Sequence, residues 1–182
     1  TLLRPSKESV MKKLSLILIL MLSLFSYAQS SEKAGSDFDK EIAARMIDSS
    51  IQRFKIAEDV TIEDAIDSMK LRANLLNFKL VADLPLSDQI KASGEESKHM
   101  QILAFCDALI AKEMVEYNII FAGFLPCRIA AVEDKDGQGW LVTTNMDMML
   151  HAVELPEKLQ PMAKQVRDTI YSIVDAGVNG DL

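Results

Sequence analysis

The sequence predicts an α+β domain in which helices cover one antiparallel sheet. Segments that alternate apolar and polar residues are interleaved with segments whose apolar residues recur at helical spacing. The expected order is β-α-β-β-α-β-β-α, and hairpins outnumber crossover connections, which favours an antiparallel sheet. The composition, 49% apolar and 26% charged over 182 residues, fits one globular core.

Residues 51–106 supply four of these elements and a helical turn. Phe54 and Ile56 alternate with charged residues, which predicts a strand within residues 51–58. Thr61 is placed as an N-cap with Asp64 three positions later, so a helix is expected up to Leu76. The same criteria predict a strand at 78–83, one helical turn at 87–92 and a buried strand at 100–106.

The second half supplies the remaining elements. Asp107 is an N-cap for a helix ending near Asn118, and the final helix is expected to start near Pro156 with Gly177 as its C-cap. Asp-Gly within residues 134–139 indicates a hairpin. That hairpin joins strands at 127–133 and 140–144, and a short turn is expected at 147–151.

Residues 1–28 have the pattern of a secretory signal peptide. Lys12 and Lys13 precede an apolar stretch at 14–25, and Ser26-Tyr27-Ala28 offers small residues at the cleavage positions. About twelve apolar residues are too few for a membrane span, which needs roughly 20. We therefore expect translation from Met11 and bacterial export to the periplasm or medium, with no stable membrane insertion after cleavage. Residues 29–50 are expected to form a leader and a short helix, and residues 51–178 a single domain.

Charge and motifs argue against several functions. There are 20 Lys and Arg residues against 27 Asp and Glu, and the net charge of -7 disfavours a nucleic-acid partner. The sequence has no nucleophile elbow, phosphate-binding loop or dinucleotide fingerprint. We therefore assign no catalytic residue, expect no cofactor, and lean against an enzyme.

Cys106 and Cys127 are the chemically notable pair. One ends a predicted strand and the other begins the next, so their sulfurs would meet at one sheet edge if those strands are antiparallel neighbours. A disulfide closing a loop of about 20 residues would stabilise the fold by about 3 kcal/mol. Three readings stay open: a structural disulfide, buried free thiols, or a redox or metal role.

A methionine-rich segment raises the question of a soft metal. Thioether, imidazole and thiolate groups suit Cu(I). Methionine is also a common core residue, and this packing interpretation is the preferred one. The candidate copper ligands are Cys106, Cys127, Met146, Met148, Met149 and His151.

Two short segments carry a family resemblance. Phe105-Cys106, followed by Leu125-Pro126-Cys127-Arg128, resembles the family called domain of unknown function 302 (DUF302). Asp107-Ala108 replaces the Asn-Pro that the family shows after its first cysteine. The resemblance covers about residues 50–153 and implies a fold of the TATA-box-binding-protein-like class and a homodimer. It also suggests that Cys106 and Cys127 are the positions of interest. It implies no activity, because the family has no settled function.

Together these observations lead to one functional expectation. The protein is an exported, non-catalytic binding or homodimeric assembly module, with an unidentified small ligand left open. The alternatives are a thiol-redox protein acting through Cys106 and Cys127, or a copper-binding protein.

Overall fold

The structure, a computed structural model, describes residues 39–181. The predicted signal peptide and the predicted start at Met11 lie outside these residues. The chain divides into two compact units, the first ending at Asp48 and the second beginning at Ser49. Residues 39–49 are helical and exposed, and a short helix is predicted in this part of the sequence.

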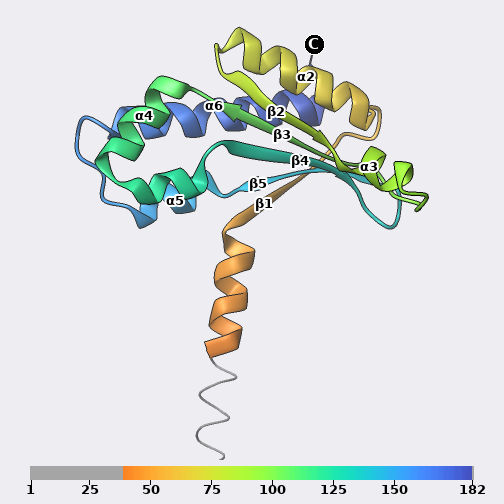
Figure 1. Cartoon of the computed structure of the whole chain (residues 1–182), viewed down its shortest axis with the longest axis horizontal. Coiled ribbons are helices and arrows are strands. Elements are labelled where there is room, and N and C mark those ends of the chain that lie inside the picture. Colours follow the sequence, from red (N-terminus) through yellow and green to blue (C-terminus); the bar gives the residue numbers. More distant parts are fainter. Residues whose placement is uncertain (1–38, 182) are drawn as a thin grey trace, which may run out of the picture. The chain divides into compact units, whose positions relative to one another are not determined.

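Five strands form one sheet within the second unit (Figure 1). The spatial order is β1-β5-β4-β3-β2, and all four neighbouring pairs are antiparallel. The predicted α+β class with an antiparallel sheet is thereby confirmed. The strands are β1 (Ile51–Lys55), β2 (Lys79–Pro85), β3 (Met100–Cys106), β4 (Cys127–Glu133) and β5 (Gly139–Thr144).

Two long helices, α2 (Ile62–Leu75) and α6 (Gln160–Asn179), lie on the same side of this sheet (Figure 1). The α2 N-cap forms as predicted, because the Asp64 backbone N–H donates to Thr61 Oγ1 at 3.0 Å. The shorter helices are α3 (Leu86–Ala92), α4 (Ala108–Tyr117), the 3₁₀ helix η1 (Ile119–Phe124) and α5 (Met146–Ala152). Asp107 caps α4 as expected.

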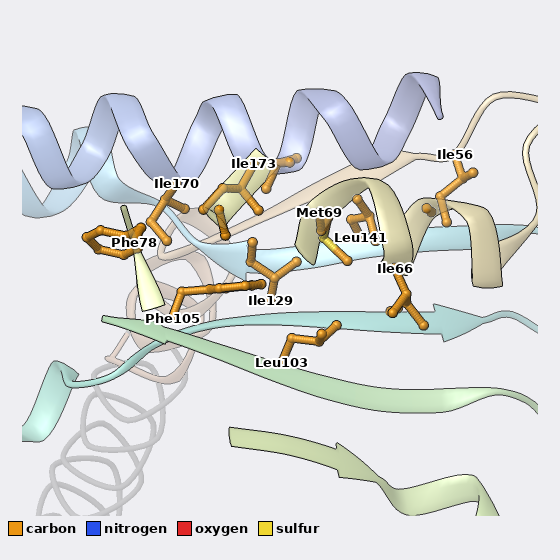
Figure 2. Close-up of a cluster of buried hydrophobic side chains, with 14 of the residues drawn as sticks. Ile56, Ile66, Met69, Phe78, Leu103, Phe105, Ile129, Leu141, Ile170 and Ile173 are labelled. Atoms are coloured by element: carbon orange, nitrogen blue, oxygen red, sulfur yellow. The ribbon is translucent and has the colours of Figure 1, made fainter. Parts of the chain in front are cut away.

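The hydrophobic core fills the space between these two helices and the sheet. Figure 2 shows Met69 of α2 and Ile173 of α6 in one cluster with Ile129 and Leu141 of the sheet. All four side chains are almost completely buried. Burying one such side chain stabilises the fold by about 1.5–3 kcal/mol. Among residues 39–181, this main core cluster lies on the face of the sheet that α2 and α6 cover.

The final helix and the segment before it differ from the prediction. Helix α6 begins at Gln160 instead of near Pro156, because residues 157–159 form a turn. Gly177 is not the C-cap; Gly180 is, with the left-handed φ of 66° that glycine adopts without strain. The segment expected to form a short turn at 147–151 is the helix α5, capped by the Asn145 side chain.

Within residues 39–181, none of the helices combines the length and apolar character that crossing a bilayer requires.

Candidate functional site: the open face of the sheet

The sheet face opposite the core is not covered by the two long helices of residues 49–181. Successive strand residues point to opposite faces, and the strand pairing identifies this face in each strand, including β2, where the register shifts between Leu80 and Ala82. We call it the open face. Among residues 39–181, none of its members belongs to the core cluster. They are Ile51, Arg53, Lys55, Lys79, Ala82, Leu84, Met100, Ile102, Ala104, Cys106, Arg128, Ala130, Val132, Trp140, Val142 and Thr144.

The middle of the open face is apolar. Ala130, on the central strand β4, is paired with Ile102 of β3 and Val142 of β5. The next row places Val132 beside Met100 and Trp140. Most of these side chains are half-buried by their neighbours in the sheet. A contiguous apolar area that is partly exposed is typical of an interaction surface.

The charged groups of the open face are all cations, although the whole chain carries a net charge of -7. Arg53 and Lys55 lie on the edge strand β1, and Lys79 lies on the other edge strand, β2. Only Arg128 is on the central strand β4. Three of the four cations therefore stand at the rim, where long side chains reach water while their stems cover apolar neighbours.

Trp140, on the open face, forms a hydrogen bond with the turn that precedes β5. Its indole N–H donates to Asp134 Oδ2 at 2.8 Å. Asp134 Oδ1 accepts the backbone N–H groups of Asp136 and Gln138, which closes the predicted turn. The hydrogen bond from Trp140, with those backbone N–H groups, lowers the pKa of Asp134. The only tryptophan of the chain is thus fixed on this face.

The structure brings the two cysteines to the same end of neighbouring strands but not to the same face. Strands β3 and β4 are antiparallel neighbours, as the disulfide argument requires. The register, however, pairs Cys127 with Phe105, so Cys106 points to the open face and Cys127 to the core face. Both are free thiols in the structure. A disulfide needs facing Cβ atoms, which this register does not provide.

Neither thiol is activated. Burial raises the pKa of Cys127 to about 11. Burial, and next the charge of Asp107, raises the pKa of Cys106. Both side chains are therefore protonated at neutral pH, whereas the thiolate is the form that attacks disulfides and binds metals.

The candidate copper ligands are divided between two environments. Met146 belongs to the core cluster, and Met149 and Cys127 pack against it. Cys106 is on the open face. Met148 accepts a hydrogen bond from the Ser49 hydroxyl at 3.7 Å, and His151 is exposed, its Nδ1 2.7 Å from the Asp147 carbonyl oxygen. Within residues 39–181, no three His, Cys, Asp or Glu side chains converge on a metal position.

Sequence reasoning did not single out the open face, although a signal for it exists. Strands β3, β4 and β5 carry apolar residues at successive positions rather than at alternate ones. Near-continuous apolar strands are typical of sheets that are covered on both faces. Here residues 49–181 place long helices on one face only.

The fold and this face define a class of protein, an α+β domain with a half-covered antiparallel sheet. The family model for the domain of unknown function DUF302 matches residues 54–177, and the chain belongs to this family. The resemblance noted from the two cysteine-containing segments is thereby confirmed.

A solved structure with a similar fold comes from the same family. It is described as an uncharacterized conserved protein DUF302 from Bacillus stearothermophilus, with a TM-score of 0.57 and 16% sequence identity. The match covers 69% of this chain and 96% of that chain. At this identity the likeness establishes the fold alone. No curated protein matches the chain.

Proposed function

We propose that this protein is a non-catalytic assembly module that forms a homodimer by packing two open faces together. The observation that carries the proposal is the apolar middle of the open face, where Ala130 lies between Ile102 and Val142. Burying this area on a second copy would give β3, β4 and β5 the second cover that their apolar residues favour.

The area of the open face is compatible with a specific dimer. Five strands about 4.8 Å apart, with about six residues of about 3.3 Å each, give a flat area of roughly 480 Å² per copy. Two copies then bury roughly 1,000 Å², the lower limit of specific interfaces, before the relief of the side chains is added. The interface is therefore small, and a dimer that dissociates on dilution is expected.

The arrangement of residues also suits a two-fold contact. In such a dimer the same patch meets itself, so a central residue lies near its own copy. Ala130, Ala104 and Ala82 are small and allow two sheets to approach closely. The rim cations on β1 and β2 stay in water. No observation of comparable weight favours the thiol-redox or copper alternatives, because both thiols have a raised pKa.

The test is the molar mass of the protein by light scattering. The wild type is expected to have twice the monomer mass. Ala130→Lys would place two ammonium groups against each other at the centre, and we expect it to be monomeric with an unchanged circular dichroism spectrum. Val132→Lys is a second variant in case the first one does not fold.

The matched control is Leu75→Lys. Leu75 is 68% exposed at the end of α2 and is not part of the open face. It introduces the same charge and should leave the dimer intact. A wild type that is monomeric even at high protein concentration, or a dimer that survives both open-face variants, contradicts the proposal.

Export is the second part of the proposal, and it rests on the charged, apolar and small-residue pattern within residues 11–28. The mature protein should begin at Gln29 and be found in the periplasm or medium of a bacterium that expresses it. Intact mass of the exported fraction checks this, and an uncleaved chain retained in the cells contradicts it.

A further inference from the structure

A groove lies between the short helix α5 and the first half of α6. Its volume is about 530 Å³, within the range of roughly 300–1,000 Å³ typical of small-molecule sites. Leu150, Val153 and Leu155 supply an apolar side. None of the residues that line the groove belongs to the open face, so the argument does not depend on the proposed dimer.

The opposite side of the groove is polar and comes from α6. Gln160, Lys164 and Arg167 line it at spacings of four and three residues, which puts them on one face of the helix. The Gln160 Nε2 group donates to the Leu155 carbonyl oxygen at 2.9 Å and joins the two sides at one end. Arg167 Nε lies 3.4 Å from Asp147 Oδ1 and joins them at the other.

The two cations of the groove differ in what they already contact. Arg167 is held by Asp147 and, at 2.9 Å, by Asp168. Among the residues that the structure describes, no acidic side chain forms an ion pair with Lys164, which is exposed at the groove. One ammonium group therefore remains available beside an apolar surface.

We propose that this groove binds a small monocarboxylate that carries an aliphatic chain. The carboxylate would accept hydrogen bonds from Lys164, and the chain would lie on Leu150, Val153 and Leu155. Glu154 also lines the groove and would repel a second negative charge, which restricts the ligand to a single carboxylate. Because Asp147 and Asp168 already pair with Arg167, the attraction for the carboxylate comes from Lys164 alone.

The experiment is calorimetric titration of the protein with octanoate, with acetate and octanol as comparison ligands. Octanoate should bind saturably with one site per chain, and acetate and octanol should each bind at least about tenfold more weakly. Octanol binding as tightly as octanoate, or no saturable octanoate binding, overturns the proposal.

Variants of two lysines locate the site. Lys164→Gln should weaken octanoate binding about tenfold or more, whereas Lys164→Arg should retain it. Lys158→Gln removes a neighbouring exposed lysine that does not line the groove and should leave affinity unchanged. Equal losses in Lys164→Gln and Lys158→Gln, or none in Lys164→Gln, overturn the proposal. Because Lys164 is on the surface, both variants should fold, and unchanged thermal unfolding checks this.

Discussion

Gly177 lies where helix α6 packs against α2 and the sheet. It lies in the third-last position of α6 and is completely surrounded by packed atoms. A Cβ atom there would stand 2.7 Å from Met69 Cγ and 2.8 Å from Leu141 Cδ1. Glycine is therefore needed at this position because α6 packs closely against its neighbours there, and not because the helix ends there.

Gly177→Ala should destabilise the fold although alanine is the better helix former. Displacing Met69 and Leu141 should cost about 1–3 kcal/mol of unfolding free energy, as measured by urea denaturation. Gly123→Ala is the control, because a Cβ at Gly123 meets no atom within 4 Å. It should change stability by less than about 0.5 kcal/mol in either direction. A Gly177→Ala variant as stable as the wild type would refute this account of the helix contact.

The cysteines give a second prediction at the residue scale. Because the register separates Cys106 and Cys127 onto opposite faces, unfolded and unreduced protein should contain two reactive thiols by alkylation and intact mass. In folded Ala130→Lys, Cys106 should react before Cys127, and both should need higher pH than an ordinary thiol because their pKa values are raised. Cys106→Ser and Cys127→Ser identify the labelled residue. Absence of any thiol before reduction would instead establish the disulfide.

At the scale of the element, helix α5 depends on a contact with a residue that is distant in the sequence. Its seven residues are too few to be stable alone. Its first turn is held by Tyr171 of α6, whose hydroxyl oxygen accepts the backbone N–H groups of Met146 at 3.1 Å and Asp147 at 3.3 Å. The partner is 25 residues away in the chain, so the segment looked like a turn in the sequence.

Tyr171→Phe should therefore weaken α5. The ring and its contact with Phe54 remain, but two N–H groups lose their acceptor, which should cost about 1–3 kcal/mol of unfolding free energy. Hydrogen exchange should also become faster in residues 146–152. Tyr117→Phe is the control, because Tyr117 is 48% exposed and its hydroxyl makes no hydrogen bond within residues 39–181. Equal stability of the two variants would contradict the capping role.

Elements with local signals were predictable from sequence, and features set by distant contacts were not. The caps of α2 and α4 are marked by Thr61 and Asp107, and the hairpin by its Asp-Gly step. The end of α6 depends on packing at Gly177, and the groove beside α5 on contacts such as that of Gln160 with Leu155. A shift of one residue in the pairing of β3 with β4 would change which faces Cys106 and Cys127 occupy, and the strand patterns alone do not specify this register.

At the scale of the whole molecule, the fold is half of a layered structure. Helices α2 and α6 cover one face of the sheet, and residues 49–181 supply no comparable cover for the other (Figure 1). The strands nevertheless carry apolar residues on both faces. A second copy would complete the layers without any additional element, and this is the basis of the homodimer proposed above.

Trp140 allows this claim to be tested in one measurement. It is the only tryptophan of the chain, and it lies on the open face next to Val132. The measurement is acrylamide quenching of its fluorescence over a wide range of protein concentration. We predict weak quenching at high concentration and stronger quenching on dilution, as the dimer dissociates and uncovers the indole. Wild-type quenching that does not change with concentration and equals that of the monomeric variant Ala130→Lys would contradict burial of the open face by a second copy.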